Sequence, residues 1–293
     1  MTVQVKAFFH QDTGTLSYLV IDSSQRHAVI IDSVLDFDVA SGEVSADFAN
    51  QQLDYIRNNK LQLDWVLDTH AHADHLSAAD YLRNQTGAQT VIGQGIIDVQ
   101  SRFSKMFNRV NNDLTEQHEF DYLYVEGEAL TFGSSSLTGI STPGHTSDSV
   151  SFLIDDNVFV GDTLFMPDGG TARCDFPGGS ADLLWDSIAR IHELPEHYKI
   201  WVCHDYQPDG RELRYQTTVK ESSTSNIHVR NGIDKSEYVD LRTKRDVTLS
   251  VPKLLYPSLQ VNLWGAILPE KECNGIQYIK IPLTNNLSNQ EGN

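Results

Sequence analysis

The sequence contains few cysteines and no long hydrophobic run. Cys174, Cys203 and Cys273 are the three cysteines of 293 residues, and none forms a C-x-x-C pair. This usage is typical of a reducing compartment and argues against a disulfide framework. No apolar stretch reaches the roughly 18 residues of a membrane span, and residues 1–10 lack the apolar segment of a signal peptide. We therefore expect a cytoplasmic protein without a membrane partner.

Basic residues are also scarce. The chain has 22 lysines and arginines against 40 acidic residues, and its net charge at pH 7 is −18. Nucleic acids and anionic membranes bind basic surfaces, so the sequence excludes both as partners. A small anionic substrate is not excluded, because one or two local arginines are enough to bind it.

The length and a hydrophobic content of 40% are sufficient for one large core. We expect a main domain over residues 1–222 and a C-terminal extension, residues 223–293, packed on it. Apolar runs at 28–32, 64–69 and 137–142 predict buried strands. Helical periodicity or capping signals predict helices over 46–58, 75–84, 96–110, 182–194, 210–221 and 236–245.

One short loop carries an unusual density of metal-ligand side chains. Residues 69–75 read Thr-His-Ala-His-Ala-Asp-His, between a predicted strand and a predicted helix. Ligands commonly bind at the carboxyl ends of strands in such sheets. The small alanines allow a tight turn, so that the nitrogen and oxygen donors can converge on one ion. The sequence predicts a metal site here, rather than a solvated polar loop, with the candidate ligands His70, His72, Asp74 and His75.

Three later residues repeat this arrangement of a ligand-type side chain after a strand. His145 follows a Pro-Gly turn, and His204 follows the apolar run 200–203. Asp162 ends another apolar run, where a buried carboxylate without a partner would be costly. Metal coordination accounts for all three, so seven candidate ligands lie on four strand-end loops.

The string T-H-x-H-x-D-H, followed by P-G-H-T, G-D and H-D-Y, resembles the metallo-β-lactamase superfamily over roughly residues 3–215. The resemblance implies an α+β fold, a four-layer αβ/βα sandwich with two mixed β-sheets and the metal site at one edge. By this resemblance one metal position is formed by His70, His72 and His145, and a second by Asp74, His75 and His204. Asp162 would lie between them.

Residues 161–165, 171–176 and 178–180, with His204-Asp205-Tyr206 and Arg211, are similar to the persulfide dioxygenases, in particular to bacterial β-lactamase-hydrolase-like proteins. This likeness implies one non-haem Fe(II) per chain, bound by His70, His145 and Asp162. The open positions of the iron would take a substrate sulfur and O₂. The remaining candidates would orient ligands and water: His72, Asp74, His75 and His204. No catalytic residue is expected beyond the metal centre.

Glyoxalase II, which is also similar in its histidine string, provides the alternative. A dizinc hydrolase of a glutathione thioester, or of a lactone or lactam, would use all seven side chains around a bridging hydroxide. Both enzymes need the same residues, so the number and identity of the metals stay open at this stage.

The expected substrate is glutathione persulfide or another small thiol derivative, with O₂ as the second substrate. Arginine suits the carboxylates of glutathione, and we expect Arg173, Tyr206 and Arg211 to contact the substrate. Asp175 could instead pair with Arg173, and Arg211 could be a surface residue. A homodimer is the default oligomer for a soluble enzyme.

Overall fold

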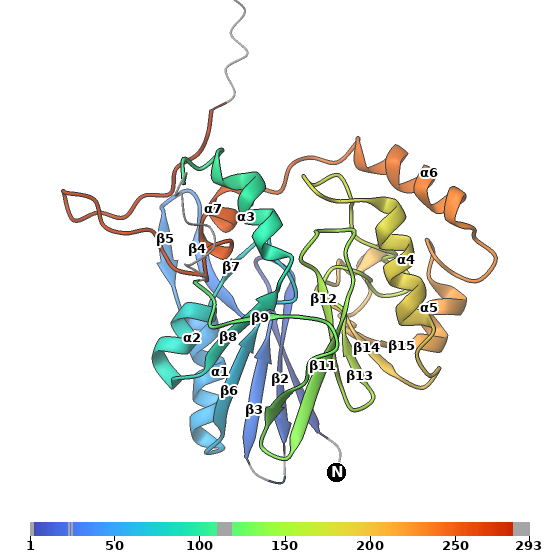
Figure 1. Cartoon of the computed structure of the whole chain (residues 1–293), viewed down its shortest axis with the longest axis horizontal. Coiled ribbons are helices and arrows are strands. Elements are labelled where there is room, and N and C mark those ends of the chain that lie inside the picture. Colours follow the sequence, from blue (N-terminus) through green and yellow to red (C-terminus); the bar gives the residue numbers. More distant parts are fainter. Residues whose placement is uncertain (1–2, 23, 25, 110–118, 284–293) are drawn as a thin grey trace, which may run out of the picture.

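The computed structural model describes residues 3–22, 24, 26–109 and 119–283. Two six-stranded sheets form its centre (Figure 1). The first sheet has the order β1-β2-β3-β6-β8-β9. Its strands are β1 (Gln4–His10), β2 (Thr15–Asp22), β3 (His27–Ile31), β6 (Gln62–Leu67), β8 (Gln89–Gly93) and β9 (Tyr122–Tyr124). β1, β2 and β3 pair antiparallel, and the pairs from β3 to β9 are parallel.

The second sheet runs in sequence order from β10 to β15. Its strands are β10 (Leu130–Phe132), β11 (Ser135–Ser141), β12 (Val150–Ile154), β13 (Asn157–Phe159), β14 (Lys199–Trp201) and β15 (Gln216–Thr218). Only the β13–β14 pair is parallel, so both sheets are mixed. A small third sheet has the order β5-β4-β7 and consists of β4 (Val34–Asp38), β5 (Glu43–Ser45) and β7 (Leu76–Ser77).

Strand β2 shows why the chain forms layers. Successive side chains of a strand point to opposite faces. Leu16 and Tyr18 join Phe152 and Ile200 of the second sheet in the core between the sheets. Leu19, from the other face, packs into the core beneath the helices of the first sheet. A strand covered on both faces has no polar side, which explains its almost continuous apolar sequence.

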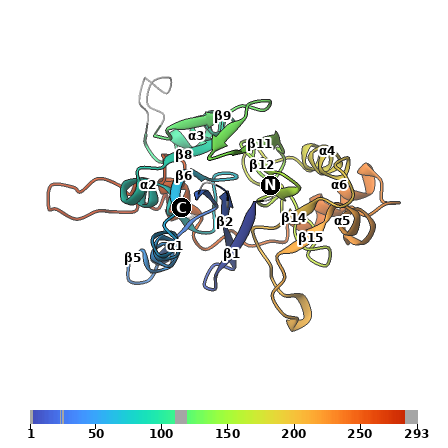
Figure 2. The ribbon, with the colours of Figure 1, turned by 90° about the horizontal axis from the view of Figure 1, so that it is seen from below.

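Helices cover the outer faces of both sheets (Figures 1 and 2). On the first sheet lie α1 (Asp47–Asn58) and α2 (Ala79–Thr86), whose apolar faces contribute Leu53 and Leu82. α4 (Ala181–His192), α5 (Val219–Ser225) and α6 (Lys235–Asp246) gather beside the second sheet. The α/β/β/α order confirms the predicted four-layer sandwich. No helix in the described ranges is both long and apolar enough to span a bilayer.

The helix predicted over 210–221 is wrong except for its last three residues, 219–221, which begin α5. Residues 216–218 form β15, which pairs with β14, and only α5 is helical. The backbone N–H of Val202 donates to the carbonyl of Tyr215 (3.2 Å), so pairing with the sheet overrides the local pattern. The predicted domain boundary at residues 222/223 lies within α5, and the division into domain and extension stays a prediction.

Two other helices are shorter than predicted. α2 begins at Ala79, because β7 pairs with β4 and takes the first residues of the predicted helix. α3 covers Ile96–Ser104 only, and the break expected at 111–113 lies outside the described residues. A further helix, α7 (Leu255–Asn262), was not predicted, and it packs beside α3 in a small apolar cluster.

Candidate metal centre

The seven predicted ligands meet at one edge of the sandwich, where strands of both sheets end. The loop of residues 69–75, called the histidine loop below, follows β6 of the first sheet. His145, Asp162 and His204 follow β11, β13 and β14 of the second sheet. The five histidines are buried, while the side chains of Asp162 and Asp74 are 11% and 31% exposed. The fold therefore brings together residues that are up to 134 positions apart (from 70 to 204) in the sequence.

Asp162 lies between two groups of imidazoles. Its Oδ2 atom is 3.9 Å from His70 Nε2 and 3.6 Å from His145 Nε2. Its Oδ1 atom is 3.5 Å from His204 Nε2, and Asp74 Oδ2 is 3.1 Å from that same nitrogen. Each carboxylate oxygen thus faces a different side of the site.

The donor atoms form groups small enough for one ion each. Within each of three groups the donors lie within 4.8 Å of one another: His70, His145 and Asp162; His72, Asp74 and His75; Asp162, Cys203 and His204. Cys203 is the only member that the sequence did not suggest. Burial raises the pKa of its thiol well above 9.0, so the sulfur stays protonated in the folded chain.

The histidines of the second sheet each use one ring nitrogen for the protein and leave the other free. His145 donates from Nδ1 to the carbonyl of Arg173 (2.8 Å), which directs Nε2 to the site. His204 donates from Nδ1 to the carbonyl of Gly14 (3.1 Å) in the same way. A backbone carbonyl that fixes the tautomer is a common support for a metal-binding histidine.

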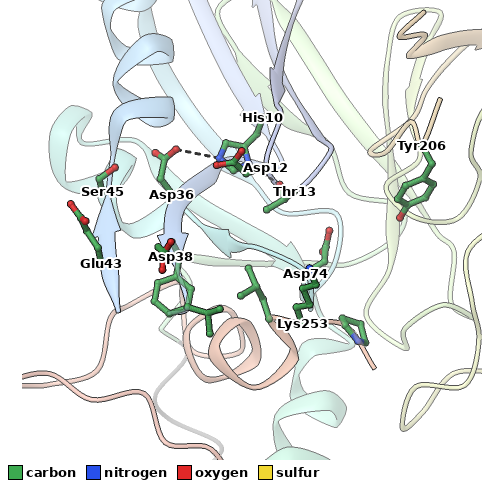
Figure 3. Close-up of a pocket in the computed structure, with 14 residues that line it drawn as sticks. His10, Asp12, Thr13, Asp36, Asp38, Glu43, Ser45, Asp74, Tyr206 and Lys253 are labelled. Carbon is green, nitrogen blue, oxygen red and sulfur yellow. Dashed lines mark hydrogen bonds and ion pairs between the residues drawn. The ribbon is translucent and has the colours of Figure 1, made fainter. Parts of the chain in front are cut away.

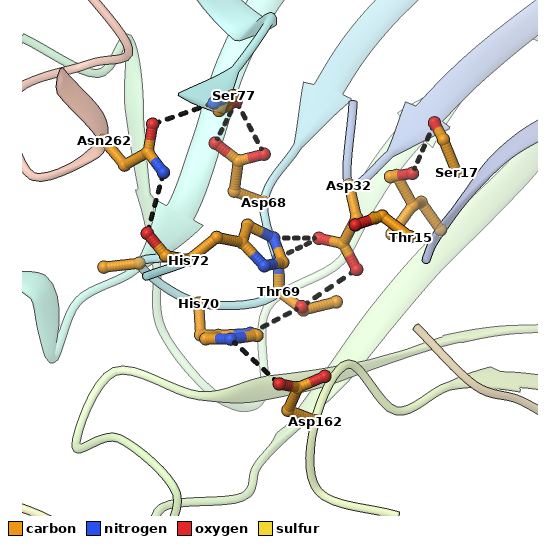
Figure 4. Close-up of polar contacts among 12 residues, drawn as sticks. Thr15, Ser17, Asp32, Asp68, Thr69, His70, His72, Ser77, Asp162 and Asn262 are labelled. Carbon is orange, nitrogen blue, oxygen red and sulfur yellow. Dashed lines mark hydrogen bonds and ion pairs between the residues drawn. The ribbon is translucent and has the colours of Figure 1, made fainter. Parts of the chain in front are cut away.

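The histidine loop follows the same rule through side-chain partners. His72 Nε2 is 3.0 Å from Asp32 Oδ1, and His70 Nδ1 is 3.0 Å from Thr69 Oγ1 (Figure 4). Among the described residues, the buried atoms left without a hydrogen-bond partner include His70 Nε2, His72 Nδ1, His75 Nε2 and Asp162 Oδ1. Buried polar atoms without partners are rare in proteins, and these converge, so the donor set fits one or two divalent cations.

Asp32 is a site residue that the sequence analysis missed. It accepts hydrogen bonds from the backbone N–H (2.7 Å) and hydroxyl (3.0 Å) of Thr69 and contacts His72 (Figure 4). Burial raises its pKa, against the lowering by His70 and Thr69. Its position after the apolar strand β3 was the available signal, because a carboxylate there must find buried donors.

The sequence analysis also missed Asn262 of α7. This residue belongs to the predicted C-terminal extension and holds the histidine loop by hydrogen bonds. Its Nδ2 group donates to the carbonyls of His72 (2.8 Å) and His75 (2.7 Å), and its Oδ1 accepts from the N–H of Ser77 (2.8 Å). Asp148 holds the same loop by accepting from the N–H of Ala71 (2.7 Å). No sequence pattern marked these distant partners.

The structure shows why the G-D motif needs glycine at position 161. Its φ of +52° lies in the left-handed region, and a Cβ there would come within 2.4 Å of Thr69 Oγ1. Only glycine tolerates both constraints without strain. The absence of a side chain lets the Asp162 loop approach the histidine loop.

Burial and charge set the protonation of the site. Burial lowers the pKa of His70 and His72 well below 6.5, so both rings are neutral and offer a lone pair. For His204, burial is outweighed by the carboxylates of Asp162 and Asp74, which raise its pKa to about 10. A cation among these groups would displace that proton and compensate the carboxylates.

A cavity of about 340 Å³ opens onto these donors. It is lined on the metal side by Asp74, His145 and Asp162 and elsewhere by Arg173, Arg242 and Arg245. Phe165, Phe176 and Tyr206 add aromatic walls. A second cavity, of about 490 Å³, shares Asp74, Tyr206 and Pro252 with the first and is rich in carboxylates (Figure 3).

The three predicted substrate contacts differ in how available they are. Tyr206 is 66% exposed, lines both cavities, and its ring stacks on that of His204 at 5.9 Å. Arg173 lines the first cavity, but its guanidinium pairs with both oxygens of Asp175 (2.6 and 2.7 Å). Contact of these two residues with a substrate stays a prediction.

Arg211 does not line either cavity. Its guanidinium bonds to Asp205 (2.6 and 2.7 Å) and to Asp168 (2.8 Å). The geometry therefore favours a structural ion-pair network over the substrate contact expected from the sequence. Asp168 lies 43 residues before Arg211, so no local pattern indicates that pair, whereas Asp205 lies only six residues away.

Comparison with known proteins agrees with this architecture. A family model described as "Metallo-beta-lactamase superfamily" matches residues 11–204. The chain is 46% identical over 282 residues to "Glyoxylase B2" of Dictyostelium discoideum, an alignment that covers 96% of this chain and 97% of that protein. It is 29% identical over 255 residues to the mitochondrial persulfide dioxygenase ETHE1 of Bos taurus (86% and 83% covered). The crystal structure of ETHE1 from Myxococcus xanthus superposes with a TM-score of 0.73 at 28% identity, with 90% of this chain and 100% of that chain covered.

Proposed function

The chain belongs to the metallo-β-lactamase superfamily, and on this premise we propose that it is a persulfide dioxygenase. The superfamily makes it a metal-dependent enzyme. In our proposal one Fe(II) is bound by His70, His145 and Asp162. The substrates are glutathione persulfide, O₂ and water, and the products are sulfite and glutathione, so that the two oxygen atoms of O₂ and one of water leave as sulfite.

One observation carries the proposal. The donors of His70, His145 and Asp162 form a group of their own within 4.8 Å, and the cavity reaches it at His145 and Asp162. Two histidines and one carboxylate on one face of an ion are typical of non-haem Fe(II) oxygenases, where three positions stay open for substrate and O₂. The likeness to persulfide dioxygenase ETHE1 of Bos taurus supports this choice of chemistry.

The chain's own residues would orient and shield the reactants. Asp32 and Asn262 hold the histidine loop, while Phe165 and Phe176 give the cavity apolar walls that limit the access of water. His204, paired with Asp74 at 3.1 Å, is placed to orient a water molecule beside the iron position. When bound, Fe(II) supplies the redox chemistry that no side chain of this cavity can supply.

A dizinc hydrolase is the second candidate, and a specific observation favours it. His72 Nδ1 and His75 Nε2 are also buried without partners, and the donors of these residues group with Asp74. This would be the second metal position of a hydrolase with a bridging hydroxide. The 46% identity to "Glyoxylase B2" is consistent with that alternative.

Metal content and oxygen uptake together test the proposal. We expect one iron per chain after purification without added metal, and oxygen consumption on addition of glutathione persulfide that Asp162→Ala abolishes. Asp74→Asn is the discriminating variant, since it keeps the single-iron group intact but removes a ligand of a second metal. A dioxygenase would keep its iron content in Asp74→Asn. Two zinc ions in the wild type, loss of one in Asp74→Asn, and thioester hydrolysis without oxygen uptake would contradict the proposal.

A further inference from the structure

A turn near the N-terminus contacts histidines that come from both sheets. Residues 11–14 connect β1 to β2, and the carbonyl of Gly14 accepts a hydrogen bond from His204 Nδ1 (3.1 Å). Thr15 pairs with His204 through the backbone, and its hydroxyl oxygen lies 3.3 Å from His75 Nδ1. The turn is therefore a fixed support for the site, although none of its residues is a candidate ligand.

From His75 a continuous series of hydrogen bonds leads away from the metal donors. Thr15 Oγ1 is 2.7 Å from Thr13 Oγ1, which is 2.8 Å from His10 Nδ1. The other nitrogen of this ring, Nε2, is 3.2 Å from Asp36 Oδ1 at the wall of the second cavity (Figure 3). These five side chains are called the hydrogen-bond chain below.

The carboxylate end fixes the direction of every hydrogen bond in the chain. Asp36 also accepts a backbone N–H at its other oxygen (2.9 Å), and an ionised carboxylate can only accept, so His10 donates from Nε2. In the neutral ring Nδ1 then accepts, and the hydroxyl of Thr13 donates to it. A hydroxyl has one hydrogen, so Thr13 must accept from Thr15, and Thr15 must accept from His75 Nδ1–H.

The metal-side end agrees with this direction. With the hydrogen on Nδ1, His75 Nε2 carries a lone pair, and this buried atom has no hydrogen-bond partner among the described residues. His75 belongs to the donor group with His72 and Asp74, and Asp74 Oδ1, 3.4 Å from His75 Nδ1, favours a hydrogen there as well. The opposite tautomer would direct an N–H hydrogen toward the other donors, and such a nitrogen cannot bind a cation.

We propose that His10, Thr13 and Thr15 are positioning residues of the metal centre. They hold His75 as the Nδ1–H tautomer, so that the lone pair of Nε2 faces the site, and Asp36 sets the direction of the chain from the wall of the second cavity. The inference goes beyond the proposed function, since it holds whether His75 orients water beside one iron or binds a second metal.

Nitrogen-15 NMR of the histidine side chains tests this in the metal-free protein. In the wild type we expect the Nδ1–H tautomer for His75 and the Nε2–H tautomer for His10, with the signals assigned through His75→Gln and His10→Gln. Thr13→Val keeps the shape of the side chain but removes its hydroxyl, which leaves the Thr15 hydroxyl free to donate to His75 Nδ1. The Nε2–H tautomer of His75 should then become the major form, and Thr13→Ser should restore the wild-type spectrum.

Thr217→Val is the matched control. Thr217 is a buried threonine of β15 whose hydroxyl donates to Glu221 (2.8 Å), and it lines neither cavity. Its replacement should leave both histidine tautomers as in the wild type. The Nε2–H tautomer of His75 in the wild type, an unchanged His75 in Thr13→Val, or an equal change in Thr217→Val would overturn the inference. The wild-type spectrum decides even if Thr13→Val does not fold.

Turnover separates this inference from the proposed function. With glutathione persulfide, Thr13→Val should lower kcat roughly 10-fold, the lower end of the range for a lost supporting group, and Thr13→Ser should recover it. Absence of oxygen consumption in the wild type, combined with the expected tautomers, would refute the dioxygenase and leave the positioning role standing. Oxygen consumption by the wild type with an unchanged kcat in Thr13→Val would do the reverse.

Discussion

At the scale of single residues, the site works by assigning one nitrogen of each imidazole to the protein. Carbonyls hold His145 and His204, and Asp32 holds His72. Each of these hydrogen bonds fixes both the orientation of the ring and its tautomer, so the other ring nitrogen points into the site with its lone pair. This arrangement costs stability in the absence of an ion, since buried donors and acceptors stay unpaired.

Asp32→Asn tests this residue-scale arrangement. An amide can still accept a hydrogen bond but no longer compensates charge, so His72 loses its electrostatic support and the loop its fixed tautomer. We expect metal affinity to fall roughly 10- to 100-fold, the range for a lost supporting carboxylate, measured by competition with a chelator. Asp64→Asn is the control, because Asp64 contacts His27 at 2.6 Å well away from the site. Equal losses in both variants would show a general folding defect instead.

At the scale of elements, the sequence predicted the strands that carry the metal ligands, because these depend on local patterns. Each ligand follows an apolar run, and strands that end at one sheet edge must present their next residues together. The position of Asp32 after strand β3 indicated a carboxylate that needs buried donors, but its partner His72, 40 residues away, could not be identified from the sequence. Asn262 contacts a loop 190 residues earlier, and no local pattern records such a pair. The strand at 216–218 was hidden because its hydrogen bonds go to β14, which the local composition does not show.

His228, within the predicted C-terminal extension, supports the wall of the cavity beside the metal donors, because it hydrogen-bonds to Thr171 of that wall. The backbone N–H of Thr171 donates to His228 Nδ1 (3.0 Å), so this nitrogen must be unprotonated in the folded chain. Burial, with Arg242 and Arg245 nearby, lowers the pKa of His228 to about 4. An unfolded chain, with a histidine pKa near 6.5, takes up this proton more readily.

Acidification should therefore destabilise the protein through His228. The folded pKa lies below the unfolded one, so the contribution is fully present above about pH 6.5 and is lost as the pH falls toward 4. We expect His228→Gln, which keeps an acceptor but cannot titrate, to show a smaller loss of unfolding free energy between pH 6.5 and 4.5, by about 2 kcal/mol. Urea unfolding at several pH values measures this difference. Parallel curves for the two proteins would contradict the assignment.

At the scale of the whole molecule, a metal ion held by these residues would join the two halves of the sandwich. The first sheet provides the histidine loop, and the second provides His145, Asp162 and His204. Without an ion, several carboxylates lie buried near one another, and burial raises the pKa of Asp32, Asp68, Asp148 and Asp162. A bound cation relieves this repulsion and links strands that are otherwise held by side-chain packing.

Removal of the metal should consequently lower the stability of the entire fold. A ligand present at about 1,000 times its Kd stabilises the native state by about 4 kcal/mol. In a chain of this size that corresponds to a fall in Tm of roughly 5–10 °C after chelation. Asp162→Ala, which lacks the residue between the two sides of the site, should melt at one temperature with or without chelator. Differential scanning calorimetry checks both proteins, and a chelator-induced shift of the same size in Asp162→Ala would mean that the stabilising ion binds elsewhere.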